Sequence, residues 1–367
     1  MTLRIIMRLQ KLYSAIRQIN EVASINHYPK MVSYIRFFQL ATSGQYSPVE
    51  IFMEDLLNPA WSDEERNGMI SKECFLRFQE KINPASHRYL TEDKIAFHHY
   101  CTKNNLSVPE LVAVFDPNGQ SYWENGQKIG TESDLLNGLS FYPFDIIVKP
   151  ACSCHGEGVF ALDFVDGKHC LASNPNLPLS DTFKKAIGKN PDQYILQKRL
   201  YSHQALAGLT GNTVLQSLRL ITYLDENNQP QLMIRKIKFP KQGSLIDNFA
   251  WGINEGRLCL IDQHGIIEKT VRYSHAKRGL VWHDHVEDVN GQKVKFKIPF
   301  WEQCVALVLD AQKVFAPLRT IGWDVAVTDD GPYLIEGNIF WDPLKPQEGS
   351  MRSICQLLTK LHEPLAR

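Results

Sequence analysis

The sequence predicts an α+β fold in which a helical N-terminal region precedes a mixed body. Over residues 1–90, apolar residues recur at the three- and four-residue spacing of a helix. From residue 91 to 345, segments with helical spacing alternate with segments that have the two-residue alternation of a strand. Near the end of that body, two apolar runs flank Asp329-Asp330-Gly331, which is typical of a tight β-hairpin. This mixture excludes an all-helical protein.

Length and charge restrict the classes of protein to which the chain can belong. Its 367 residues suffice for two domains or one large multi-lobed domain. Lys and Arg together number 40, as do Asp and Glu, so no net field attracts nucleic acid. The eight cysteines have no repeated pair spacing, and Cys152-x-Cys154 alone is a poor zinc half-site. We therefore expect free thiols, no secretory signal and a cytoplasmic location.

The N-terminal region is predicted to contain helices at residues 3–19, 31–40, 49–57 and 72–82. The first carries Arg4, Arg8, Lys11 and Arg17 among apolar residues, which is too much charge for a transmembrane helix. A helix packed on its own domain is favoured, and a helix lying on a membrane surface is the alternative. No set of residues with catalytic character occurs before residue 91.

The next informative run is a strand that ends at a lysine and leads into a glycine-containing loop. A helix is predicted at 91–104, and strands are predicted at 108–115, 145–149 and 159–164. Lys149 ends the second strand, and the loop from Cys152 to Gly158 follows it. Glycines let backbone N–H groups approach phosphate oxygens, and a lysine adds a point charge. An ordinary hairpin is the alternative, since the run is not a Walker A loop.

A second group of strands carries several cations. After a helix at 181–187, strands are predicted at 194–200, 215–224 and 231–239. The last two place Arg219, and either Arg235 or Lys236, on a sheet face, although a solvated face would look the same. Five lysines are predicted to be surface charges: Lys238, Lys241, Lys293, Lys295 and Lys297. Helices are predicted at 300–315 and 351–361.

The predicted hairpin brings three oxygen-bearing side chains together. Strand alternation points Glu336 and Asn338 to one face, and Asp324 can meet them from the partner strand. Carboxylate and amide oxygens are the ligands that Mg²⁺ prefers. A solvated hairpin is the alternative, but Glu336 lies in a run that is otherwise apolar enough to be buried.

The order of these features, a lysine with a glycine loop, a connector at 197–200 and an Asp…Glu-x-Asn hairpin, resembles the ATP-grasp superfamily. It is most similar to the sugar-transfer-associated ATP-grasp group, relatives of glutamate-ligase-type enzymes found with polysaccharide biosynthesis. The resemblance covers roughly residues 91–345. Gly322-Trp323-Asp324, followed by Ile335-Glu336-Gly337-Asn338, is its most specific part.

The resemblance implies two α+β lobes with ATP between them. Residues 1–90 would be the helical N-terminal region, 91–200 the small lobe with the glycine loop, 201–345 the large lobe with the Mg²⁺ site, and 346–367 a C-terminal helix. The implied activity is ATP-dependent ligation of a small-molecule carboxylate to an amine or hydroxyl, through an acyl phosphate and with release of ADP. An amino-acid or sugar-linked substrate in polysaccharide or cell-surface biosynthesis is implied. A small-molecule kinase and a non-catalytic nucleotide-binding scaffold remain alternatives.

The resemblance also assigns site residues. The residues implied to bind ATP are Lys149, Ser153, His155, Gly156, Gly158, Gln197, Lys198, Leu200, His203, Gln204 and Arg235. Asp324, Glu336 and Asn338 would hold two Mg²⁺ ions, and the residues with catalytic roles would be Arg219, Asn248 and Lys149. Gln197 stands where the family usually has Glu. Another lysine is usual before the glycine loop, and Lys94 or His98 occupies that place.

Overall fold

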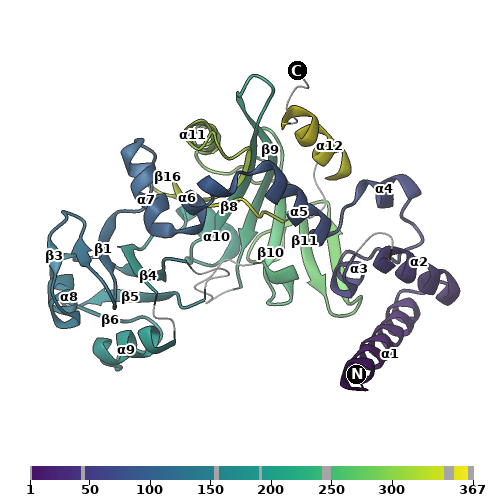
Figure 1. The fold of residues 1–367 in the computed structure, drawn as a ribbon, viewed down its shortest axis with the longest axis horizontal. Coiled ribbons are helices and arrows are strands. Elements are labelled where there is room, and N and C mark those ends of the chain that lie inside the picture. Colours follow the sequence, from purple (N-terminus) through teal and green to yellow (C-terminus); the bar gives the residue numbers. More distant parts are fainter. Residues whose placement is uncertain are drawn as a thin grey trace.

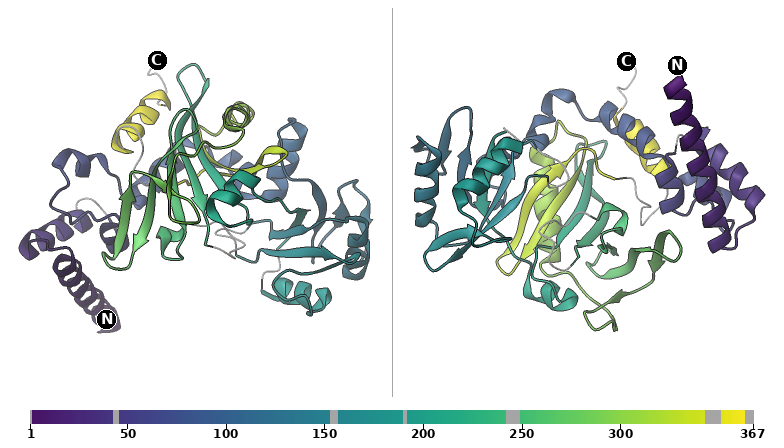
Figure 2. Two further views of the ribbon diagram at one scale, coloured as in Figure 1. Left: turned by 180° about the vertical axis from the view of Figure 1, so that it is seen from behind. Right: turned by 90° about the horizontal axis from the view of Figure 1, so that it is seen from below.

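The computed structural model describes residues 2–42, 46–152, 157–189, 192–241, 249–342 and 351–362. A small sheet lies at one end of the elongated molecule, a large sheet lies in the middle, and the N-terminal helices lie at the other end (Figures 1 and 2). This arrangement confirms the predicted α+β class and the helical N-terminal region. No helix among these described residues has both the length and the apolar character that crossing a bilayer requires.

The N-terminal region consists of short helices that local side chains begin and end. Their bounds are α1 (Thr2–Ile25), α2 (Lys30–Thr42), α3 (Pro48–Met53), α4 (Asp63–Gly68), α5 (Lys72–Ile82), η1 (Ala85–His87), α6 (Tyr89–Glu92) and α7 (Lys94–Lys103). Ser47 and Glu50 form a capping box at α3. The helix predicted at 91–104 is divided in two, because Asp93 and not Thr91 caps α7 and accepts hydrogen bonds from Ile95 and Ala96 N–H.

The first three helices pack around their own core and also contact the large sheet. Ile19, Phe37 and Ile51 are buried together there. Glu21 in α1 forms an ion pair of 2.6 Å with Arg278, which precedes an edge strand of the large sheet. A Cβ at Gly279 would lie 2.8 Å from the Phe52 carbonyl oxygen, so glycine permits this close approach. The N-terminal core is thereby fixed to one end of the large sheet.

The small sheet has seven antiparallel strands in the order β3-β2-β1-β7-β4-β5-β6. Helices α8 (Glu132–Gly138) and α9 (Leu179–Lys189) supply Leu135 and Phe183 to its core, and η2 (Leu139–Phe141) follows α8. The strand bounds are β1 (Leu111–Phe115), β2 (Ser121–Trp123), β3 (Lys128–Ile129), β4 (Ile146–Pro150), β5 (Phe160–Val165), β6 (Lys168–Leu171) and β7 (Tyr194–Lys198).

The large sheet is also antiparallel, in the order β12-β11-β10-β9-β8-β15-β16. Its strands are β8 (Ser217–Leu224), β9 (Pro230–Phe239), β10 (Arg257–Ile261), β11 (Ile267–Ser274), β12 (Gly279–His283), β15 (Thr320–Thr328) and β16 (Gly331–Asn338). Strands β13 (Val286–Glu287) and β14 (Lys293–Val294) form a separate pair. The predicted hairpin is therefore β15–β16, and Gly331 begins β16 at φ 117°.

Helices cover both faces of the large sheet. Helix α11 (Trp301–Val314) and α10 (Gln204–Thr210) pack with Leu218, Leu220 and Ile237 on one face. On the other face, α5 and α12 (Met351–His362) pack near Ile221 and Ile234. A further short helix, η3 (Ala250–Gly252), precedes β10. The two faces thus differ in character, since one is a closed core and the other is only partly covered.

Helix α7 packs on the large sheet, although its position in the sequence assigned it to the small lobe. Phe97 and Cys101 belong to the core of the large sheet. The hydroxyl of Tyr100 donates a hydrogen bond to the Val314 carbonyl at the end of α11. The segment that precedes the small sheet in the chain is therefore part of the support of the large sheet.

Asn83 links the N-terminal region to β15, the strand that carries Asp324. Its amide donates to the Thr320 carbonyl, and its Oδ1 accepts from Arg319 N–H at 2.8 Å. The side chain is fully buried. We predict that Asn83→Ala lowers the free energy of unfolding by about 2 kcal/mol, because buried backbone groups lose their partners. Urea unfolding followed by tryptophan fluorescence measures this.

The control for this prediction is Asn227→Ala, which removes an exposed asparagine in the turn between β8 and β9. A change of less than about 0.5 kcal/mol is expected there. If both variants lose the same stability, Asn83 does not link the two regions in the way described.

Candidate active site

A cleft of about 1310 Å³ lies between the two sheets. The small sheet contributes Ile147, Lys149 and Lys198 to its wall. The large sheet contributes charged residues from four strands, namely Arg219, Lys236, Lys238, Asp324 and Glu336. The cleft therefore lies against the partly covered face of the large sheet, and two pieces of chain far apart in sequence form it.

Asp324 lies at the centre of this charged surface. The register pairs Asp324 with Arg219 across β15 and β8. Arg219 Nε lies 2.6 Å from Oδ1 of Asp324, and Lys238 Nζ donates to Oδ2 at 3.0 Å. Asp324 is only 5% exposed. Removing a carboxylate from water is costly, and these two cations offset that cost.

Glu336 and Asn338, the other two predicted cation ligands, lie on the neighbouring strand β16. Asp324 pairs with Glu336 in the β15–β16 register, and Asn338 Nδ2 donates to Glu336 Oε1 at 3.1 Å. Burial raises the pKa of Glu336, but Arg219, the Asn338 hydrogen bond, Lys238 and Lys94 outweigh it, so the pKa is below its usual value. Glu336 is consequently ionised at neutral pH.

These residues have the donor atoms that a hard divalent cation needs. Oδ1 of Asp324 is buried and accepts no well-aligned hydrogen bond in the part of the chain that the structure describes. Within those same residues, no cluster of three or more His, Cys, Asp or Glu side chains forms a complete metal site. Two carboxylates and one amide therefore fit Mg²⁺ held jointly with a phosphate ligand, which is the usual mode for this ion.

Lys149 lies across the cleft and belongs to a chain of hydrogen bonds that reaches α7. Its Nζ donates to Gln197 Oε1 at 3.4 Å, and the Gln197 amide lies 3.3 Å from His98 Nδ1. Burial, with the charges of His99 and Lys149, lowers the pKa of His98 to about 4. His98 is thus a neutral ring that orients Gln197, and it does not supply positive charge.

Lys94 is the residue of α7 that reaches the cleft. It lines the cleft wall, and its backbone N–H donates to the Ala151 carbonyl at 3.1 Å. Its charge also contributes to the lowered pKa of Glu336. Of the two candidates for the additional lysine position, Lys94 faces the cleft and His98 lies buried behind Gln197.

The other residues expected to bind ATP occupy different places. Lys198 and Leu200 line the cleft, and Gln197 is buried beside it. Gly158 has φ 74°, and a Cβ there would lie 2.8 Å from Pro150 Cγ. The remaining loop residues Ser153, His155 and Gly156, and also Asn248, lie outside the described residues.

Three of the expected residues do not line the cleft. His203 caps α10 and lies 3.8 Å from Asp329 Oδ1, to which Gln204 N–H also donates. Arg235 projects to the opposite face of the large sheet, where its Nε donates to the Ile261 carbonyl. The strand register places Lys236, and not Arg235, beside Arg219.

Lys238 of β9 is the main residue that sequence reasoning missed, and of the two alternatives Arg235 and Lys236 it is Lys236 that faces the cleft. Lys238 was expected to be a surface charge, but this expectation is wrong, because it is 8% exposed and paired with Asp324. Burial lowers the pKa of Lys236 to about 8, with Asp342 opposing the shift and Arg219 adding to it. Strand alternation was the available signal, since it places both lysines on the face of Arg219.

The N-terminal region also contributes to the cleft, through residues that the sequence pattern did not single out. Helix α5 supplies Lys72, Leu76 and Glu80, and Tyr89 comes from α6. Lys72 Nζ lies 3.9 Å from Asp342 Oδ2. Amphipathic spacing predicted α5, but it does not indicate that polar residues of its exposed face border a site.

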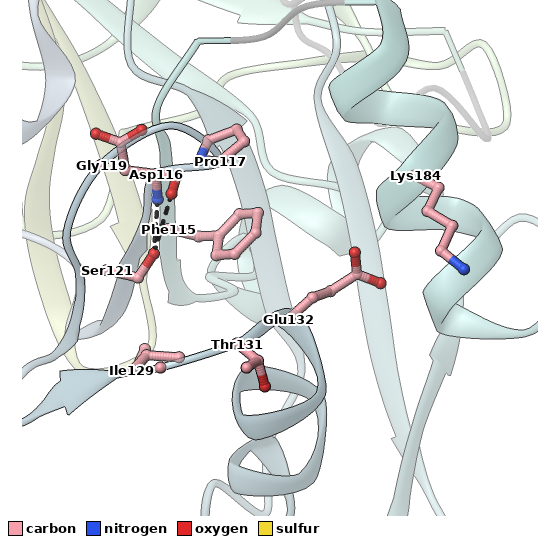
Figure 3. A pocket seen from close by; sticks show the side chains of 10 residues that line it. Phe115, Asp116, Pro117, Gly119, Ser121, Ile129, Thr131, Glu132 and Lys184 are labelled. Carbon is pink, nitrogen blue, oxygen red and sulfur yellow. Dashed lines mark hydrogen bonds between the residues drawn. The ribbon is translucent and has the colours of Figure 1, made fainter.

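A second pocket of about 490 Å³ lies at the edge of the small sheet (Figure 3). Phe115, Asp116 and Ile129 line it together with Glu132 from α8 and Lys184 from α9. The Ser121 hydroxyl bonds to the backbone of Asp116 there, as the figure shows. Few charged groups converge on this pocket, so the cleft between the sheets is the candidate site.

The neutral state of His98 has a consequence for stability. The pKa of His98 is about 4 in the folded chain and near 6.5 in the unfolded chain. The contribution of the neutral ring to the free energy of unfolding is therefore complete above pH 6.5 and declines as the pH falls towards 4. We predict that lowering the pH from about 7 to about 5 destabilises the parent about 2 kcal/mol more than His98→Gln.

Urea unfolding at several pH values measures this difference. His264→Gln changes an exposed histidine and should keep the pH profile of the parent. A His98→Gln profile parallel to that of the parent would contradict the neutral assignment.

Several solved structures resemble the chain at low identity. D-alanine–D-alanine ligase from Bacillus anthracis has 11% identity and a TM-score of 0.37, with 74% of this chain and 66% of that chain covered. D-alanyl-alanine synthetase A from Vibrio cholerae has 13% identity and a TM-score of 0.43, with 76% and 67% covered. L-amino acid ligase from Bacillus licheniformis has 12% identity and a TM-score of 0.36, with 70% and 42% covered. The chain thus spans about two thirds or less of the length of these proteins.

A protein-family profile, and not a curated sequence, identifies the family of this chain. Comparison with curated protein sequences gives no match. The profile of the family described as sugar-transfer associated ATP-grasp matches residues 74–361, which is most of the chain. This match begins within α5 and includes Arg219, Lys236, Lys238, Asp324 and Glu336. The chain therefore belongs to the sugar-transfer associated ATP-grasp family.

Proposed function

We propose that this chain is an ADP-forming, ATP-dependent ligase that joins a small-molecule carboxylate to an amine through an acyl phosphate. The observation that carries the proposal is the charged cleft. Asp324 and Glu336 lie beside Arg219 and Lys238 on the large sheet, and Lys149 faces them from the small sheet. Such a site combines cation ligands with groups that neutralise phosphate, and phosphoryl transfer needs both.

ATP would lie between the sheets with its phosphates directed towards the cations. Lys149 and Lys94 line the cleft and would bind phosphate oxygens. The segment from Gln197 to Leu200 would contact adenine, and Gln197 would offer a neutral carbonyl where the family usually has a carboxylate. Lys149 and His98 fix the orientation of that amide. His203, Gln204 and Arg235 have no part in this proposal, since none of them lines the cleft.

Asp324, Glu336 and Asn338 would hold Mg²⁺, which when bound supplies positive charge to the phosphate oxygens. The substrate carboxylate oxygen then attacks the γ-phosphorus, and the bond from that phosphorus to the bridging oxygen breaks, which releases ADP. The amine nitrogen next attacks the acyl carbon, inorganic phosphate leaves, and the amine loses a proton. Arg219 would stabilise the charge that develops on the transferred group, which in comparable oxyanion sites is worth about 3 to 4 kcal/mol.

The end of the cleft that α5 borders would receive the substrates. Lys72 and Glu80 from α5 offer charges of both signs there, and Tyr89 and Phe340 offer aromatic surface. Figure 1 shows α5 and β4, the strand that carries Lys149, at separate positions along the long axis of the molecule. A carboxylate, an ammonium group and an apolar or sugar ring all find suitable partners at this end. An amino-acid or sugar-linked substrate in polysaccharide or cell-surface biosynthesis is consistent with this mixture.

The test is nucleotide turnover with MgATP over a panel of amino acids, uronic acids and nucleotide sugars, with hydroxylamine added to trap acyl phosphates. We predict ADP together with a hydroxamate of one acid class. Glu336→Ala should reduce turnover by roughly a hundredfold or more while the fold is retained, because a cation ligand is lost. Glu268→Ala removes an exposed glutamate on β11 of the same sheet and should leave turnover unchanged.

Other products would lead to other conclusions. ADP with a stable phosphorylated product would identify a kinase, and AMP would exclude the acyl-phosphate route. Tight MgATP binding without turnover on every acid would favour a nucleotide-binding scaffold. Equal turnover by a folded Glu336→Ala would remove the basis for the metal assignment.

The role of Lys238 allows a separate prediction. It holds Oδ2 of Asp324 at 3.0 Å from within the sheet. We predict that Lys238→Met lowers kcat/KM for MgATP by about 10- to 100-fold, because the carboxylate loses a group that orients it. Lys241→Met is the matched control, since Lys241 follows the same strand but forms an exposed ion pair with Glu255. Steady-state kinetics in which the two variants behave alike would rule out this role.

A further inference from the structure

Helix α2 has an apolar face that no other described element covers. Its inner face places Phe37 in the N-terminal core. Its outer face exposes Met31, Ile35 and Phe38, with 72%, 52% and 42% of each residue accessible. These three recur at i, i+4 and i+7, so they form a continuous stripe along the helix. Val32 is exposed beside the stripe, and these four residues form the outer α2 face.

Helix α1, which precedes α2 at the same end of the molecule, also exposes apolar side chains. Leu12 and Tyr13 are exposed on it, with Tyr13 71% accessible. Other residues of the same helix, Ile19 and Val22, are buried in the N-terminal core. Single exposed apolar side chains are common on soluble proteins, but clustered ones on two successive helices indicate an interaction surface.

The charge of this segment is as distinctive as its apolar surface. Residues 1–42 contain six Lys and Arg residues and one acidic residue, a net charge of +5, in a chain whose total is zero. The acidic residue, Glu21, is paired with Arg278 on the large sheet. Arg17 and Lys30 are exposed. Arg17 and Lys30 therefore present positive charge to solvent, together with the exposed apolar side chains, whereas the carboxylate of Glu21 is directed towards the large sheet.

The position of the segment leaves the cleft accessible. Helices α1 and α2 lie at the end of the molecule opposite the small sheet, and the views in Figures 1 and 2 agree on this. A large surface could cover them without closing the space between the two sheets.

We propose that α1 and α2 dock on an anionic lipid membrane. The outer α2 face would enter the boundary between headgroups and acyl chains, and the basic residues would contact anionic headgroups. Charge complementarity selects this occupant. In a symmetric contact between two copies the same patch meets itself, so the +5 segments would repel each other. Nucleic acid would satisfy the basic residues but would leave Met31, Ile35 and Phe38 without apolar partners.

The test is co-sedimentation of the full chain with vesicles of phosphatidylcholine, with or without about one third phosphatidylglycerol. We expect binding only to the anionic vesicles, and weaker binding at higher salt. Ile35→Ser combined with Phe38→Ser should reduce binding at least about tenfold, and so should Arg17→Glu combined with Lys30→Glu. Val165→Ser changes an exposed apolar residue of the small sheet and should bind as the parent does.

Circular dichroism and MgATP turnover in solution show that each variant is folded, and they keep this test separate from that of the catalytic proposal. Absence of binding to anionic vesicles would overturn the proposal, as would equal binding by the parent and both double variants. Self-association that Ile35→Ser with Phe38→Ser abolishes would assign the surface to a second copy. Preferential binding of DNA or RNA at the same salt would assign it to nucleic acid. Both of these last results would also overturn the membrane proposal.

Discussion

The site depends on one buried ionic contact, that of Asp324 with Arg219 and Lys238. The three side chains come from β15, β8 and β9, which are adjacent in the large sheet. Strand register fixes their spacing, because Asp324 lies opposite Arg219, and Arg219 lies opposite Lys236. A one-residue slip would turn every side chain of a strand to the other face. The cores on both faces of the sheet therefore set the geometry of the site as well as its stability.

Cations outnumber carboxylates around this contact, which has consequences for binding. Among the described residues, eight Lys and Arg residues line the cleft against six Asp and Glu residues, and Arg219, Lys236 and Lys238 lie together on one sheet face. The lowered pKa of Lys236, about 8, reflects burial and the neighbouring positive charge of Arg219. An anionic ligand relieves such repulsion, so the same surface that costs folding free energy favours a polyphosphate. This is the physical basis of the proposed nucleotide site.

The N-terminal region combines two tasks on different helices. Asn83 and the α5 side chains hold it against β15 and form one border of the cleft. Helices α1 and α2 add a separate surface at the end of the molecule, with Glu21 fixing them to Arg278. Helices α1–α3 form a core of their own and contact the large sheet at its edge, so the outer face of α2 lies apart from the cleft.

The sequence by itself determined the hairpin, its three oxygen-bearing side chains and the α+β class, since strand alternation and turn residues are local properties. Residues near one another in sequence, such as Glu336 and Asn338, share a face in any extended strand. Only the tertiary structure decided that Lys238 is buried, that Lys236 and not Arg235 faces the cleft, and that α7 supports the large sheet. It also decided that Lys94 and not His98 reaches the site, and that α5 borders it. Each of these depends on which face another part of the chain covers, and such contacts join residues too far apart in sequence for local periodicity to specify.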